Sequence, residues 1–220
     1  MLHFHKGAPF QGEHVERGSI GIFPGVFNPV TRAHLALVRA SIEQYTLRQV
    51  VFLLPTSFPH KEYSDTGFEN RILLLQAALA EDERCAVASS QAGLFYEIAA
   101  EVSEYYPLNS QLFFLCGRDA AERIVNWNYD GALSFAQQLE KFELLVASRD
   151  GVYQPPPALK KHIHTVHLSP EWNLISASGF RRAILQNQNW ERFVSPEVAR
   201  IIRQRGIYDY VSTPSDFGKR

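Results

Sequence analysis

The sequence predicts an α/β protein whose sheet is open, parallel and doubly wound, and three observations support this prediction. Short, continuous apolar runs are typical of parallel strands that are buried on both faces. Between several of these runs, apolar residues recur every three or four positions, as they do along one face of a helix. The chain has 220 residues, of which 45% are hydrophobic, and this is enough for one well-buried domain.

The apolar runs give the expected strands, which are, in chain order, Ile20–Phe23, Val50–Leu54, Leu112–Cys116, Phe142–Ala147 and His164–Leu168. The helical stripes comprise Leu35, Val38, Ile42 and Tyr45, then Ile72, Leu75 and Leu79, then Leu94, Ile98 and Val102. Residues 1–18 and 209–220 are expected to be polar extensions, so the domain should span residues 19–208. Because crossovers between parallel strands are right-handed, a ligand crevice is expected at the carboxyl ends of the strands, near the point where the strand order reverses.

Composition limits the classes of function. The 22 basic and 23 acidic residues give a formal net charge of −1, which argues against general nucleic-acid binding. Cys85 and Cys116 are too few for a disulfide framework. The N-terminal segment lacks the apolar core of a signal peptide, and no run approaches the roughly 20 apolar residues that span a membrane. We therefore expect a cytoplasmic, soluble protein that binds neither nucleic acid nor membrane; a homo-oligomer is compatible with the sequence.

Residues 25–34 read GVFNPVTRAH and follow the first expected strand. A Pro-Gly corner and a helix beginning near Thr31 place them at a strand-to-helix turn on the ligand side of the sheet. A helix N-terminus carries about half a positive charge and several unpaired N–H donors, so it favours phosphate. Thr31 and His34 are three residues apart, so both side chains should contact the same anion. The Gly-rich dinucleotide fingerprint and the P-loop pattern are missing, which argues against hydride transfer and γ-phosphate hydrolysis.

A second anion site is predicted where residues 175–181, ISASGFR, begin a helix. Ser176 and Ser178 are residue types that commonly cap a helix start by accepting hydrogen bonds from backbone N–H groups. Arg181 follows in the first turns of this helix, and its guanidinium is suited to bidentate contact with phosphate. The sequence therefore predicts two helix starts that bind one anion from different sides.

With these two segments the sequence resembles the nucleotidyltransferase superfamily, whose signatures are GxFxPxHxxH and ISSTxxR. The segments between them resemble those of the nicotinate or nicotinamide mononucleotide adenylyltransferases; they are PTSFPHK (55–61), GRD (117–119), SRDGVY (148–153) and VSPEVARIIRQRGIY (194–208). The resemblance covers residues 19–208 and implies a Rossmann-like nucleotidyltransferase fold. It also implies an activity, in which ATP and the mononucleotide are joined into a dinucleotide of NAD biosynthesis and pyrophosphate is released.

The resemblance also implies roles for particular residues. It implies catalytic roles for Thr31, His34 and Arg181, and contacts with ATP for Gly25, Val26, Phe27, Lys61, Gly117, Asp119, Ser176 and Ser178. It implies contacts with the mononucleotide for Tyr96, Trp127 and Arg149. Magnesium (Mg2+) is expected to arrive with ATP, held mainly by the triphosphate. The closely spaced His162, His164 and His167 have no acidic or thiolate partner nearby in the sequence, so no protein metal site is predicted there.

The sequence also departs from the family pattern. In the first motif Asn28 replaces Asp, Thr31 replaces His and Ala33 replaces Gly; Thr occurs at that position in the related phosphopantetheine adenylyltransferases. Residues 93–102, GLFYEIAAEV, stand where the family has GxSYTxDTL, and only Tyr96 matches clearly. The acceptor is therefore the least determined feature. Two alternatives stay open: an adenylyltransferase for another phosphorylated acceptor, such as phosphopantetheine, and a non-catalytic nucleotide-binding module.

Overall fold

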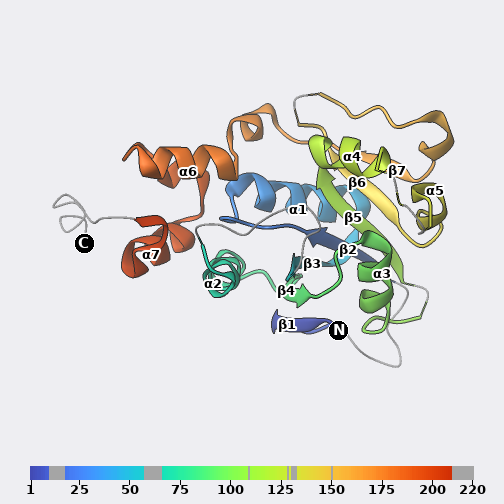
Figure 1. Cartoon of the computed structure of the whole chain (residues 1–220), viewed down its shortest axis with the longest axis horizontal. Helices are drawn as coiled ribbons and strands as arrows, with labels where there is room; N and C mark the ends of the chain where they lie inside the picture. Colours follow the sequence, from blue (N-terminus) through green and yellow to red (C-terminus); the bar gives the residue numbers. More distant parts are fainter. Residues whose placement is uncertain are drawn as a thin grey trace.

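The structure is a computed structural model that describes residues 1–9, 18–56, 66–108, 110–127, 129, 133–149 and 151–209. Within these residues, seven strands form one sheet with the order β1-β4-β3-β2-β5-β6-β7 (Figure 1). The strands are β1 (His3–Lys6), β2 (Ser19–Pro24), β3 (Leu47–Pro55), β4 (Cys85–Ser90), β5 (Gln111–Gly117), β6 (Glu143–Ala147) and β7 (Ile163–Val166). Neighbouring strands from β4 to β7 are parallel. The predicted open, doubly wound parallel sheet is confirmed.

Helices cover both faces of the sheet (Figure 1). One face packs against α1 (Arg32–Tyr45), α2 (Phe68–Ala78), α6 (Ala177–Leu185) and α7 (Pro196–Arg205), and the other against α3 (Phe95–Ser103), α4 (Arg118–Val125) and α5 (Phe135–Gln138). Along β3, Phe52 belongs to the first core, whereas Val51 and Leu53 belong to the second. Because alternate side chains of a strand point to opposite faces, this continuous apolar run is buried from both sides. No helix in the described parts of the chain is long and apolar enough to cross a membrane.

Two strands differ from the sequence-based expectation. β4 has the sequence CAVASS, and all six of its residues are buried although no strand is expected there. Alanine and serine have weak strand propensity, so only its place between two other strands makes this segment a strand. β1 lies within residues 1–18, which the sequence suggests are a polar extension, and it pairs antiparallel with β4. This part of the N-terminal segment thus covers the backbone edge of the sheet.

The strand order reverses between β2 and β5. These strands are neighbours and parallel, whereas β3, the next strand in the chain after β2, lies on the opposite side of β2. The chain leaves β2 at Pro24 and enters the GVFNPVTRAH segment, and it leaves β5 at Gly117 directly into α4. Both connections lie at the carboxyl edge of the sheet, where doubly wound folds bind their ligands.

Candidate active site

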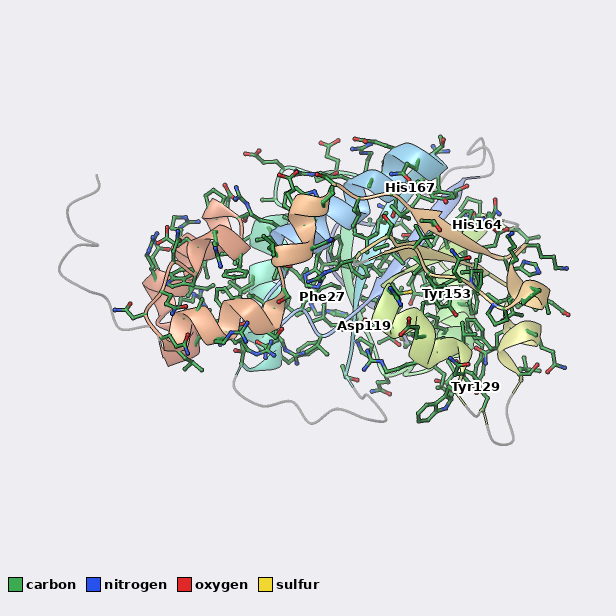
Figure 2. All side chains as sticks on the ribbon, turned by 90° about the horizontal axis from the view of Figure 1, so that it is seen from above. Phe27, Asp119, Tyr129, Tyr153, His164 and His167 are labelled. Atoms are coloured by element: carbon green, nitrogen blue, oxygen red, sulfur yellow. The ribbon has the colours of Figure 1, made fainter. Side chains whose placement is uncertain are left out.

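The candidate site lies where β2 and β5 end. The loop after β2 carries Phe27 and the first turn of α4 carries Asp119, and Figure 2 labels both near the centre of the view. Gly117 is the N-cap residue of α4, and a Cβ atom added there would meet no atom within 4 Å. The end of β5 therefore faces open space. This is the position that the sequence predicts for a crevice at the reversal of the strand order.

The turn after β2 has a constrained backbone. Phe27 has a φ of +46°, which is unusual for a residue other than glycine. The peptide bond between Asn28 and Pro29 is cis. The Phe27 ring is only 3% exposed and packs against the rings of Phe23 and Phe52. A Cβ atom on Gly25 would lie 2.8 Å from the Phe27 ring, so the close approach of ring and backbone requires glycine at this position.

α1 begins with an unusual cap. Thr31 is the N-cap residue, and its backbone N–H donates to Nδ1 of His34 over 2.9 Å. In the common capping box a Glu or Gln side chain at this third position accepts that hydrogen bond; here the imidazole does so. The Thr31 hydroxyl also lies 2.9 Å from Nδ1. Because Nδ1 accepts a hydrogen bond from a backbone N–H, the proton of the neutral ring must be on Nε2.

The Thr31 side chain is buried against His34. The spacing of Thr31 and His34 predicts that both side chains contact one anion, but Thr31 is only 1% exposed and its hydroxyl faces the imidazole. In this structure the Thr31 backbone and hydroxyl both contact Nδ1 of His34. With Nδ1 accepting from Thr31, the neutral imidazole can donate only through Nε2, a geometry suited to an oxygen that gains negative charge.

The surroundings of His34 favour its neutral form. Burial lowers the pKa of His34 from 6.5 to about 4, and the nearby positive charge of Arg149 contributes in the same direction. The rings of Phe23 and Phe27 also pack against the imidazole. At neutral pH His34 is thus an uncharged donor with a fixed tautomer, and its donor capacity does not depend on titration in the physiological range.

This geometry predicts a pH dependence. Since the pKa of His34 is lower in the folded than in the unfolded state, the stability that the neutral ring contributes is fully present above about pH 6.5 and is lost as the pH falls towards 4. We expect ¹⁵N NMR of the imidazole to show a protonated Nε2 and an unprotonated Nδ1 at pH 7, with a titration midpoint below pH 5. A midpoint near 6.5 would contradict the assigned environment.

The second helix start faces the same turn. Ser176 is the N-cap residue of α6, and its hydroxyl accepts a hydrogen bond from the Gly179 N–H over 3.0 Å. The Ser178 hydroxyl lies 3.2 Å from that of Ser176. One turn on, Nη1 of Arg181 donates to the backbone carbonyl of Asn28 over 2.7 Å, across 153 positions of sequence. The two predicted anion sites therefore meet at the turn after β2.

Arg149 adds a further cation to this region. It follows β6, and its Nη2 donates to the backbone carbonyl of Asn173 over 3.0 Å. Asn173 belongs to the 3-10 helix η2 (Pro170–Leu174), which leads into the ISASGFR segment. The guanidinium is close enough to His34 to lower its pKa. Arg149 thus lies near the neutral His34, while Arg181 contacts the turn after β2, and no ion pair among the described residues joins either guanidinium to a carboxylate.

Other predicted site residues lie in or next to α3 and α4. Asp119 is exposed in the first turn of α4, and Trp127, which is 45% exposed, lies just beyond the other end of this helix. Eight helical residues separate these ends by about 12 Å. Tyr96 is in the first turn of α3, and its hydroxyl donates to Glu97 over 3.4 Å. Lys61 lies outside the described residues.

Two side chains to which no sequence motif assigns a role hold the turn after β2. Arg71, from α2, is 2% exposed, and its Nη1 donates to the backbone carbonyl of Val26 over 3.1 Å. Tyr208, from the 3-10 helix η4 (Ile207–Asp209), donates its hydroxyl proton to Oδ1 of Asn28 over 2.7 Å. Both contacts join segments far apart in the chain, so no local pattern could have indicated them.

Comparison with protein families identifies the group to which the chain is related. The sequence model of the family described as cytidylyltransferase-like matches residues 22–183, which is more than half of the chain. The chain belongs to this family. The matched span begins in β2 and ends in α6, so it contains both of the helix starts that meet at Asn28.

Two relatives and one solved structure are similar to most of the chain. A protein of Neisseria meningitidis serogroup B, named as a probable nicotinate-nucleotide adenylyltransferase, is 27% identical over 205 residues, which are 86% of this chain and 98% of that protein. A Shouchella clausii protein of the same name is 29% identical over 197 residues, covering 86% and 96% of the two chains. Among solved structures, Plasmodium falciparum nicotinic acid mononucleotide adenylyltransferase complexed with NaAD matches with a TM-score of 0.70 over 89% of this chain and 99% of that chain. The two sequences are 17% identical, so this structural match shows a shared fold.

Proposed function

We propose that this protein is a nicotinate-nucleotide adenylyltransferase of NAD biosynthesis. The observation that carries the proposal is the hydrogen bond from Arg181 to Asn28, which joins the two helix starts predicted to bind an anion, at the reversal of the strand order. Two relatives that bear this name match 86% of the chain, and the P. falciparum enzyme of this class shares the fold. ATP and a pyridine mononucleotide are the proposed substrates.

In the proposed reaction, a phosphate oxygen of the mononucleotide attacks the α-phosphorus of ATP in line. The new oxygen–phosphorus bond forms as the bond from the α-phosphorus to the bridging oxygen breaks, and the electron pair of that bond leaves with pyrophosphate. The protein supplies position and charge rather than a covalent intermediate. Nε2–H of His34 donates to a phosphoryl oxygen that gains charge, and Arg181 with the N-terminus of α6 binds the departing pyrophosphate.

Magnesium is proposed as the metal that accompanies ATP. Among the described residues, no group of three or more His, Cys, Asp and Glu side chains is placed to hold a metal ion. We propose that a magnesium ion would be held mainly by the triphosphate, which fits a metal that keeps several waters and few protein ligands. Bound in this way, it would offset phosphate charge; the orientation of the phosphates would come from His34, Arg181 and the start of α6.

The acceptor is proposed to be nicotinate mononucleotide, with the nicotinamide form as the next candidate. Arg149 offers a cation for an acidic group of the acceptor, and we propose that the half-exposed ring of Trp127 stacks on the pyridine ring. A second candidate, a different phosphorylated acceptor such as phosphopantetheine, stays open because residues 93–102 depart from the family pattern. In α3, Glu97 accepts hydrogen bonds from the backbone N–H groups of Gly93 and Leu94, so it caps the helix in the segment that departs from the family pattern.

Pyrophosphate release tests the proposal. ATP with Mg2+ is supplied together with nicotinate mononucleotide, nicotinamide mononucleotide or phosphopantetheine, and the dinucleotide product is identified by mass. We expect the highest kcat/KM with nicotinate mononucleotide. Turnover with phosphopantetheine alone would establish the second candidate. ATP binding in calorimetry without turnover on any acceptor would instead support a non-catalytic nucleotide-binding module.

A further inference from the structure

The turn formed by Val26, Phe27 and Asn28 needs external support. The φ of +46° at Phe27 lies in a region that costs a residue other than glycine about 1–3 kcal/mol, and such a conformation persists only where the surroundings hold it. On one side the buried Phe27 ring fixes the turn to the core. The oxygens of Val26 and Asn28 accept hydrogen bonds from Arg71 and Arg181. A third donor completes this set.

That third donor is Tyr208, close to the end of the described chain. Helix α7 ends at Gly206, which has a φ of +60°, and the chain then turns back so that the Tyr208 ring packs against Phe180 of α6 with 5.1 Å between ring centres. Its hydroxyl donates to Oδ1 of Asn28 over 2.7 Å. Burial raises the pKa of this hydroxyl, although the positive charges of Arg71 and Arg181 act in the opposite direction. Tyr208 therefore stays a protonated donor and lies near both arginines that hold the turn.

We propose that Tyr208 is a positioning residue for nucleotide binding, acting through Asn28. It contacts no reacting atom; it fixes the Asn28 side chain and thereby the turn from which the backbone meets the triphosphate. Arg71 and Arg181 donate to the carbonyl oxygens of Val26 and Asn28. The partial negative charges of these oxygens are thereby offset, so they do not repel a bound anion. This inference rests on the proposed function, since it requires ATP to bind at the turn after β2.

The chain offers a matched control for this contact. The hydroxyl of Tyr106 donates to Oε1 of Gln49 over 2.6 Å, and the Tyr106 side chain is 6% exposed. This pair has the same chemistry as Tyr208 with Asn28, but Gln49 lies near the amino-terminal end of β3, away from the ligand edge of the sheet. Loss of either hydroxyl should cost folding stability, whereas only loss of the Tyr208 hydroxyl should affect nucleotide binding.

The test compares Tyr208→Phe, Asn28→Ala, the double variant and Tyr106→Phe. In Tyr208→Phe we expect faster hydrogen–deuterium exchange of the peptide that contains residues 25–30, a five- to tenfold higher Kd for ATP in calorimetry, and a similar fall in kcat/KM. In the Asn28→Ala background, Tyr208→Phe should change the Kd for ATP by less than twofold. Tyr106→Phe should bind ATP like the unaltered protein.

Three results would overturn the proposal: an ATP affinity in Tyr208→Phe within twofold of the unaltered protein, unchanged exchange at residues 25–30, or additive effects in the double variant. Exchange and ATP binding do not involve the acceptor. If the unaltered protein binds ATP but turns over no pyridine mononucleotide, the proposed acceptor fails while the role of Tyr208 is still decided. If it binds no ATP, the binding role fails, and the exchange data show whether Tyr208 holds the turn.

Discussion

Replacement of His34 by alanine is expected to lower kcat about 10²–10³-fold while leaving much of the ATP affinity. The neutral imidazole donates through Nε2, and its partners Thr31, Phe23 and Phe27 fix its position before substrate binds. Loss of one such preorganised donor typically costs roughly 3–4 kcal/mol in the transition state, where the charge on the phosphoryl oxygen is largest. Steady-state kinetics with ATP and nicotinate mononucleotide, together with calorimetry for ATP, measure the two effects separately.

Two further variants separate chemistry from folding. His34→Gln keeps a side-chain acceptor for the Thr31 N–H, because Gln is a usual residue at this position of a capping box. It should therefore fold like the unaltered protein and still lose most of its turnover. His167→Ala removes an exposed histidine from the loop after β7, which Figure 2 shows apart from Phe27, and should retain full activity. Near-normal kcat in His34→Ala would refute the assigned role.

Replacement of Arg181 by alanine is expected to lower kcat/KM for ATP about 10²-fold. The change removes a cation from the start of α6 and also the hydrogen bond that joins this helix to the carbonyl of Asn28. Hydrogen bonds that involve a charged group contribute about 1.5–3 kcal/mol each. Arg181→Lys keeps the charge but not the planar, two-pronged donor geometry, so we expect it to recover part of the activity and to remain about tenfold below the unaltered protein.

The neighbouring residue provides the control for Arg181. Arg182 is on the same helix and carries the same charge, but its side chain is exposed. Arg182→Ala should bind ATP and turn over like the unaltered protein, and thermal unfolding should show that both alanine variants are folded at the assay temperature. Equal losses of kcat/KM in the two variants would mean that only the overall charge of α6 matters, contrary to the contact proposed here.

The sequence predicts those parts of the fold that depend on continuous apolar runs. β3, β5 and β6 are buried on both faces and contain long apolar side chains, so their composition is sufficient to indicate a strand. β4 cannot be predicted in this way, because Ala and Ser fit a strand or a loop equally well. It is a strand only because it pairs with β3 and β1. β1 cannot be predicted either, because HFHK is a short, half-buried edge strand with polar residues.

In the candidate site too, local features can be predicted from the sequence, whereas features that depend on tertiary contacts cannot. A helix that begins after Thr31 can be predicted because the motif is local, and the start of α6 at Ser176 can be predicted from its capping residues. The direction of the Thr31 hydroxyl cannot be predicted from the sequence, because it depends on how the imidazole of His34 packs. The contact from Tyr208 to Asn28 spans 180 positions, and only the folded chain brings these residues together.

In the proposed enzyme, the starts of α1 and α6 bind one triphosphate between them. A crystal structure with a non-hydrolysable ATP analogue and Mg2+ tests this claim most directly. We predict that phosphate oxygens lie within roughly 2.7–3.2 Å of Nε2 of His34 and of the Arg181 guanidinium, with the backbone of the turn at residues 25–28 beside them. A nucleotide whose phosphates contact neither side chain, or only one of the two helix starts, would contradict the account.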